Sequence, residues 1–162
     1  MQFYADFRRM ELLCPLNLPP YPFKITEQNG QYFLFDDLRK KTILITPEEW
    51  VRQHFVQYLV AQKQYPKTLI QLEGGLKLNN LAKRTDILVY NPSAEKILLV
   101  ECKAPSVKIT QKVFDQIARY NMVHKVPLLA VTNGLSHFFC RIDFTEQKYF
   151  FLDNLPDYEA LK

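Results

Sequence analysis

A run of four apolar residues, Ile97 to Val100, most limits what this chain can fold into. Side chains alternate between the two faces of a strand, so a strand that is apolar at every position needs cover on both faces. The run therefore predicts a central strand with helices packed on both sides of its sheet. It leads into Glu101-Cys102-Lys103, so one face carries Ile97, Leu99, Glu101 and Lys103 and the other carries Leu98, Val100 and Cys102.

Strand and helix signals alternate around this run. Asn29-Gly30 predicts a hairpin between 24–26 and 32–35, and Gly74-Gly75 predicts a bulge or bend. Thr46 and Glu49 have the spacing of a capping box at the start of a helix. Further strands are expected at 41–45, 68–78, 85–90, 97–103, 127–132, 137–143 and 149–152, and helices at 46–62 and 110–124. This order predicts an α/β (α+β) fold with a mixed central sheet flanked by helices.

The bulk properties predict one cytoplasmic domain over 1–162, with a Pro-rich arm at 1–22 packed on it. The chain has 162 residues, 48% of them hydrophobic, and three widely spaced cysteines that we expect to be reduced thiols. It shows no secretory signal and no stretch suited to a bilayer, so no membrane partner is expected. The net charge of +4 is weakly in favour of nucleic acid.

The turn at 91–95 predicts a hairpin that brings two acids together. If the turn is centred between Ser93 and Ala94, Tyr90 faces Ile97, Leu88 faces Leu99 and Asp86 faces Glu101. Opposed carboxylates lie roughly 4.5–5.5 Å apart at Cβ and repel each other, so they need a cation or a shared proton. Mg²⁺ or Mn²⁺, bound by Asp86, Glu101 and the Cys102 backbone carbonyl, would satisfy both acids.

Lys103 lies on the same face as Glu101 and has two possible roles. It could orient or deprotonate an attacking water, or stabilise charge that develops on a phosphate. The implied chemistry is phosphodiester hydrolysis. A purely structural interpretation stays open, because Asp86 could be an ordinary residue at the end of a strand, and Glu101 and Lys103 could form a solvated pair at the edge. A register shift of one residue would separate the acids.

Four blocks carry a family resemblance: Thr46-Pro47-Glu48-Glu49-Trp50-Val51-Arg52-Gln53, Arg84-Thr85-Asp86, Val100-Glu101-Cys102-Lys103-Ala104-Pro105 and Phe114-Asp115-Gln116-Ile117-Ala118-Arg119-Tyr120-Asn121. In this order they resemble the N-terminal nuclease domain of type I restriction enzyme R subunits, within the PD-(D/E)xK superfamily. The resemblance implies a restriction-endonuclease-like sheet, with Asp86 and Glu101 as metal ligands and Lys103 as the catalytic lysine.

The same resemblance adds residues on the two helices. It implies Glu49 as a further catalytic and metal-binding acid, with Glu48 less favoured, although Glu49 is equally expected as the capping partner of Thr46. It also implies Gln116 and Tyr120, which are four residues apart and share a helical face with Lys112. Several basic residues flank the predicted site and are expected to contact the DNA backbone: Lys83, Arg84, Lys108 and Lys112.

The residues therefore predict a Mg²⁺- or Mn²⁺-dependent phosphodiester hydrolase, and the resemblance implies that it is an endonuclease acting on DNA. No helicase motor follows in this sequence, so we expect a separate helicase, translocase or other restriction-modification subunit as a partner, or a homodimer. A non-catalytic DNA-binding or scaffolding module with a nuclease fold is the main alternative. A phosphodiesterase acting on RNA or a nucleotide is a third possibility.

Overall fold

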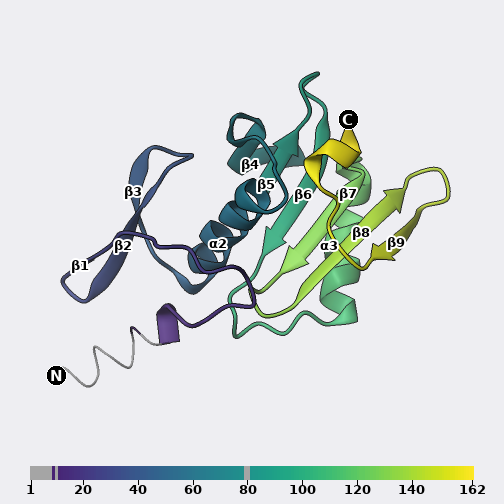
Figure 1. Ribbon diagram of the computed structural model, residues 1–162. Helices are drawn as coiled ribbons and strands as arrows, with labels where there is room; N and C mark the ends of the chain where they lie inside the picture. Colours follow the sequence, from purple (N-terminus) through teal and green to yellow (C-terminus); the bar gives the residue numbers. More distant parts are fainter. Residues whose placement is uncertain (1–8, 10, 79–80) are drawn as a thin grey trace.

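A six-stranded sheet forms the body of the computed structural model, which describes residues 9, 11–78 and 81–162 (Figure 1). Between 74 and 85 only the backbone is described. The strand order is β4-β5-β6-β7-β8-β9, and β6 and β7 are parallel while the other neighbours are antiparallel. The strands are β4 (Ile70–Leu78), β5 (Leu81–Tyr90), β6 (Lys96–Cys102), β7 (Leu128–Thr132), β8 (His137–Asp143) and β9 (Lys148–Leu152).

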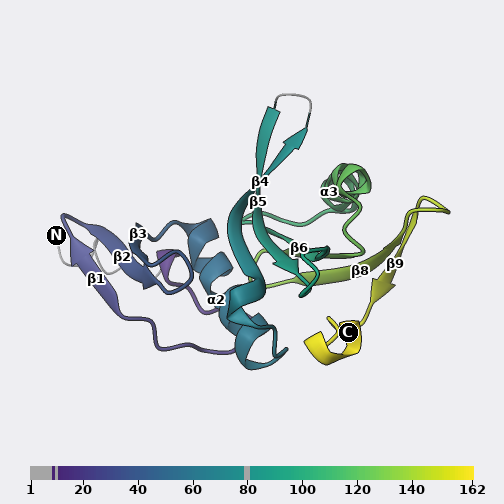
Figure 2. The same cartoon turned by 90° about the horizontal axis from the view of Figure 1, so that it is seen from above.

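The two long helices cover opposite faces of this sheet, as the apolar run predicted (Figure 2). Helix α2 (Pro47–Ala61) packs Val51, Phe55 and Leu59 against one face. Helix α3 (Gln111–His124) connects β6 to β7 and packs Phe114 and Ile117 against the other. The expected mixed sheet with flanking helices is therefore confirmed. Short 3-10 turns occur at η1 (Lys67–Leu69) and η2 (Tyr158–Leu161).

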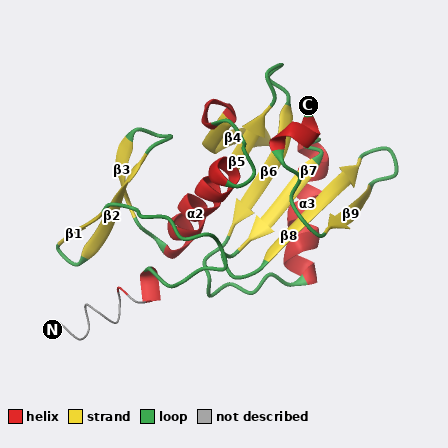
Figure 3. Ribbon diagram, in the orientation of Figure 1, coloured by secondary structure: helices red, strands yellow, loops and turns green. Residues whose placement is uncertain are grey.

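A second, three-stranded antiparallel sheet lies beside α2 and is coloured as strand in Figure 3. It consists of β1 (Ile25–Gln28), β2 (Gln31–Asp36) and β3 (Lys41–Leu44), and the expected Asn29-Gly30 turn joins the first two. Trp50 of α2 packs with Tyr32, Leu34 and Ile45 in its core. Helix α2 is thus enclosed between the two sheets, which explains why several polar side chains on it are buried.

The β5–β6 hairpin has the predicted register beside the site, although its turn differs from the prediction. Leu88 faces Leu99, as expected, and Ile87 faces Val100. Tyr90 faces Lys96 rather than Ile97, because the turn is one residue shorter and a bulge follows between Val89 and Tyr90. The bulge also places Ile97 with the α2 cluster instead of on the face of Leu99, which corrects the predicted alternation at that residue.

The β4–β5 pair is longer than predicted, because β5 begins at Leu81 rather than 85. Figure 2 shows this hairpin extending past the other strands. The bulge predicted at Gly74-Gly75 is wrong, since the register is the same on both sides of these glycines. The irregular residue is Glu73, which has a left-handed φ of 51°. No pair joins Glu73 to Asp86 in the described ladder, so β5 departs from regular pairing at Asp86.

The N-terminal arm packs on the body where it is described. Leu16 and Leu18 contact the α2 cluster, and Leu12 and Leu13 contact the three-stranded sheet. Asn17 N donates to the Gly134 carbonyl at 2.8 Å. Residues 1–8 and 10 of the predicted arm lie outside the described residues. Within the described ranges, no helix has the length and apolar character needed to cross a membrane.

Candidate active site

The carboxyl end of β6 supplies the first two residues of the candidate site. Glu101 is 8% exposed, and its Oε1 accepts a hydrogen bond from Lys103 Nζ at 2.9 Å. Burial would lower the pKa of Lys103, but the neighbouring Glu101 carboxylate outweighs this effect and the pKa is raised. Lys103 is therefore a stable cation near neutral pH. The Lys103 amide donates to the Thr132 carbonyl at 2.8 Å, which fixes the backbone where β6 ends.

Asp86 lies one step beyond the last described ladder pair, Ile87–Val100. Its Oδ2 accepts a hydrogen bond from the Cys102 amide at 2.7 Å, so the side chain bridges to β6 where regular strand pairing stops. Asp86 is 8% exposed, as is Glu101. The structure thus bonds Asp86 to the backbone of Cys102, the residue that follows Glu101 at the end of the hairpin.

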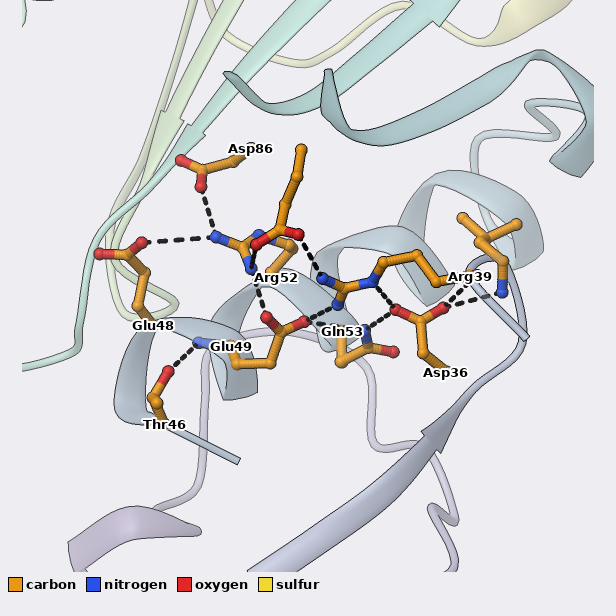
Figure 4. A network of polar contacts seen from close by, with 10 residues as sticks. Asp36, Arg39, Thr46, Glu48, Glu49, Arg52, Gln53 and Asp86 are labelled. Carbon is orange, nitrogen blue, oxygen red and sulfur yellow. Dashed lines mark hydrogen bonds and ion pairs between the residues drawn. The ribbon is translucent and has the colours of Figure 1, made fainter. Parts of the chain in front are cut away.

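Among the side chains that the structure describes, Arg52 of α2 is the cation bonded to Asp86, a contact that the sequence analysis did not predict (Figure 4). Its Nη2 donates to Asp86 Oδ1 at 2.5 Å and lies 3.4 Å from Glu48 Oε1. Its Nη1 donates to Glu49 and lies 3.8 Å from Glu73 Oε1. The spacing of Arg52 from Glu48 and Glu49, four and three residues along a helix, could have revealed those two contacts but not the one with Asp86.

Glu49 faces a buried polar network rather than Asp86 (Figure 4). It accepts hydrogen bonds from Arg39, Arg52 and Gln53. Arg39 also pairs with Asp36, so the network ties the end of β2 to α2. Half of the expected capping box is present, because Thr46 Oγ1 accepts from the Glu49 amide at 3.1 Å. The Glu49 carboxylate is instead held by the two arginines and Gln53.

Glu48, the less favoured acid in the sequence, is the helix residue coupled to the site. Burial raises the pKa of Glu48, and the nearby Asp86 carboxylate raises it further. Arg52 and Lys103 lower the pKa of Glu48 and Glu101 raises it, so the charged residues at the end of the β5–β6 hairpin act on this side chain. The pKa of the buried Cys102 thiol is raised by burial and then by Asp86, with smaller contributions from Glu101 and Glu48. The charges of Asp86, Glu101 and Glu48 therefore all influence the end of β6.

Of the remaining predicted site residues, only some lie near the end of β6. Gln116 is exposed on α3, whereas Tyr120 is partly buried and its pKa is raised by burial and then by Glu101. Lys108, after β6, and Lys112, at the start of α3, are exposed. The side chains of Lys83 and Arg84 lie outside the described residues, although both are in β5.

The carboxylate oxygens of the candidate site are of the type that a hard divalent ion prefers, but the described acids are not clustered in threes. Carboxylate oxygens are what Mg²⁺ and Mn²⁺ prefer. In the described part of the chain, however, no three His, Cys, Asp or Glu side chains lie close enough to hold a metal ion. The described network around Arg39 and Arg52 contains five carboxylates against two guanidinium groups, which leaves three negative charges in excess if all are ionised. Charge and donor type therefore fit a metal, and Arg52 is the competing cation.

The comparisons with known proteins identify the family. A family model described as the type I restriction enzyme R protein N terminus matches residues 47–156. This range includes α2, α3, the six-stranded sheet and the acids Glu48, Asp86 and Glu101. The chain belongs to this family. A solved fragment described as an HsdR subunit of a type I restriction enzyme from Vibrio vulnificus YJ016 is 23% identical, with a TM-score of 0.35. That alignment covers 57% of this chain and 18% of the Vibrio chain. None of the curated proteins compared with the chain matches it.

Proposed function

We propose that this R protein N-terminal domain is a metal-dependent endonuclease that hydrolyses phosphodiester bonds of DNA. The observation that carries the proposal is the pair of buried acids at the end of the β5–β6 hairpin, where Asp86 accepts from the Cys102 amide and Glu101 accepts from Lys103. Membership of a restriction enzyme family supports DNA as the substrate. The superfamily expected for such a site is PD-(D/E)xK.

Asp86 and Glu101 are the proposed metal ligands, with the Cys102 backbone carbonyl as a further one. Glu48 is proposed as the acid from α2 in place of Glu49, because the Glu49 carboxylate is taken up by two arginines. A bound Mg²⁺ or Mn²⁺ would polarise the phosphoryl group and lower the pKa of an attacking water. The Cys102 amide orients Asp86 for this role.

Lys103 is proposed as a fixed positive charge rather than as a base. Its raised pKa keeps the ammonium group charged near neutral pH, which suits stabilisation of the negative charge that develops on a phosphate. Tyr120 and Gln116 are proposed to line the α3 side of the site. Lys108 and Lys112, with Lys83 and Arg84, are proposed to contact the DNA backbone.

Cleavage of supercoiled plasmid in Mg²⁺ or Mn²⁺ tests this proposal. Asp86→Asn, Glu101→Gln and Lys103→Met should each reduce cleavage by at least about 10²-fold, the usual loss for one preorganised electrostatic group. Glu95→Gln is the matched control, because it removes an exposed carboxylate from the same hairpin away from the site. Absence of cleavage by the wild type with either ion, or cleavage that is unchanged in Asp86→Asn and Glu101→Gln, would overturn the proposal.

A non-catalytic DNA-binding module is the second candidate, and the Arg52–Asp86 ion pair favours it. An arginine that permanently neutralised Asp86 would leave no place for a metal. This function predicts salt-dependent DNA binding that survives Asp86→Asn and Glu101→Gln, with no cleavage in any ion. Cleavage of a labelled duplex, measured beside fluorescence anisotropy at several salt concentrations, distinguishes the two candidates.

The proposed partners follow from the family. We propose that the domain works with a separate helicase, translocase or other restriction-modification subunit, or as a homodimer that cuts both strands. Size-exclusion chromatography with light scattering, with and without duplex DNA, tests the homodimer. A single mass equal to one chain under both conditions would count against it.

A further inference from the structure

Every described partner of the Arg52 guanidinium is a carboxylate. Nη2 contacts Asp86 at 2.5 Å and Glu48 at 3.4 Å, while Nη1 contacts Glu49 and lies 3.8 Å from Glu73. The buried Nε has no hydrogen-bond partner in the described part of the chain. Arg52 is therefore held as a cation among acids, with no described bond to a backbone carbonyl that would fix it in one orientation.

The two ends of the guanidinium face different sets of acids. Nη2 contacts Asp86 and Glu48, two of the three acids proposed for the metal site, whereas Nη1 contacts Glu49 and lies near Glu73, and both of these acids also pair with Arg39. Arg52 can therefore release Asp86 and still keep charged partners. The side chain is 7% exposed, so it stays in a buried environment where an unpaired charge would be costly.

We propose that Arg52 is a resident cation that shares Asp86 with the divalent ion, holding Asp86 beside Glu48 until the ion binds and then remaining on Glu49 and Glu73. Arg52 is a positioning residue in this account, and the inference rests on the proposed metal-dependent function. Without the ion, Arg52 offsets repulsion between the acids. With the ion, the two cations compete, so Arg52 sets how much Mg²⁺ or Mn²⁺ the domain needs.

Arg39 offers a matched control within the same network. It pairs with Asp36, Glu49 and Glu73 and has no described contact with Asp86 or Glu48. Arg39→Gln and Arg52→Gln thus remove one positive charge each from the same cluster. A difference between them isolates the direct contact of Arg52 with Asp86.

Calorimetric titration of Mn²⁺ into the purified proteins tests the inference. Competition predicts that Arg52→Gln binds Mn²⁺ on the order of tenfold more tightly than Arg39→Gln, within the range typical of coupling between two ligands. It also predicts that the metal-free Arg52→Gln protein gains a larger rise in Tm on adding Mn²⁺. Equal or weaker Mn²⁺ binding by Arg52→Gln would overturn the inference while leaving metal binding by the wild type intact.

A measurement on the wild type covers the case in which Arg52→Gln does not fold. The Nε–H signal of Arg52 in a ¹⁵N spectrum should shift during a Mg²⁺ titration with the same midpoint as binding, while the Arg39 signal moves less. An Arg52 signal that stays still while Mg²⁺ binds would overturn the inference. If neither the wild type nor any variant binds either ion, the proposed function itself fails, which is a different result.

Discussion

Glu48 and Glu49 are consecutive residues of α2, yet the Glu48 side chain is 46% exposed and the Glu49 side chain only 9%. Glu49 is enclosed by Arg39 and Arg52, whereas Glu48 is turned toward Asp86 and the end of β6. Glu49 therefore stabilises the fold, and Glu48 is the acid of α2 that we propose as a metal ligand. The two residues can be separated experimentally because their substitutions should affect different properties.

Glu48→Gln should impair metal binding without loss of metal-free stability. The folded pKa of Glu48 is raised by burial and by Asp86, so the charged carboxylate costs stability once the pH rises through that pKa. A neutral glutamine removes this cost at pH 7. We expect an unchanged or higher Tm without metal, a smaller rise in Tm with Mn²⁺, and slower plasmid cleavage.

Glu49→Gln is the counterpart and should mainly destabilise the fold. Removing one partner of a buried ion pair typically costs about 3–5 kcal/mol, and Glu49 pairs with two arginines. Urea unfolding at pH 7 measures this loss. If Glu49→Gln kept its stability but lost metal binding, while Glu48→Gln behaved like the wild type, Glu49 would be the helix acid that the sequence suggested.

Lys103→Met should slow cleavage by roughly 10²–10³-fold while Mn²⁺ binding is retained. Because Glu101 raises the pKa of Lys103 against the effect of burial, the ammonium group stays protonated across the neutral range. The wild-type rate should therefore not depend on Lys103 deprotonation between about pH 6 and 9. Lys96→Met, at the other end of β6, serves as the control. A rate that rises with pH near neutrality, and loses that dependence in Lys103→Met, would show that Lys103 acts as a base.

Asp36→Asn should weaken the link between the three-stranded sheet and α2. Burial would raise the pKa of Asp36, but hydrogen bonds and charge from Arg39 lower it below 3.8. The unfolded chain then binds more protons than the folded chain just below pH 4, so stability falls as pH drops through the folded pKa. Removing this buried partner should lower the free energy of unfolding by about 3–5 kcal/mol at pH 7. It should also make the fall of that free energy at acid pH less steep.

Asp37→Asn provides the control for the loss of stability at pH 7. Asp37 lies next to Asp36, but it is exposed and pairs with Lys40 and Lys67 at the surface. Solvent screens such pairs, so urea unfolding at pH 7 should give a stability close to that of the wild type. Equal destabilisation by the two substitutions would contradict a buried role for Asp36.

Lys108→Ala with Lys112→Ala should weaken DNA binding in a salt-dependent way. Each lost phosphate contact reduces the slope of log K against log salt by about 0.9, so the double variant should lose roughly two units of slope. Lys148→Ala is the control, because Lys148 is exposed on β9 at the edge of the sheet. Equal salt slopes for the wild type, the double variant and Lys148→Ala would show that Lys108 and Lys112 do not contact the DNA backbone.

The β5–β6 hairpin has some features that the residue pattern predicted and others that it did not. The apolar run predicted the central position of β6, because alternation requires cover on both faces. The predicted turn was one residue too long, and the bulge after it restored the expected Leu88–Leu99 pair. Nothing in the residues signalled this bulge, since it depends on the left-handed backbone of Ala94 and on the Asn91–Glu95 bonds of the turn.

The polar network around Arg52 could not be predicted from the sequence, for a different reason. Helical spacing relates Arg52 to Glu48 and Glu49, but it does not show that a second sheet buries the polar side of α2. That enclosure brings Arg39 and Asp36 to Glu49, and so decides which of two neighbouring glutamates is neutralised. Membership of the R protein N-terminus family is shown by the match over residues 47–156.

A crystal soaked in Mn²⁺ tests the central claim most directly, through the anomalous signal of the metal. The account predicts a peak bound by the Asp86 and Glu101 carboxylates at roughly 2.0–2.4 Å, with the Arg52 guanidinium moved from Asp86 toward Glu49. The contradicting result is saturating Mn²⁺ with no peak between Asp86 and Glu101, and with Arg52 still bound to Asp86.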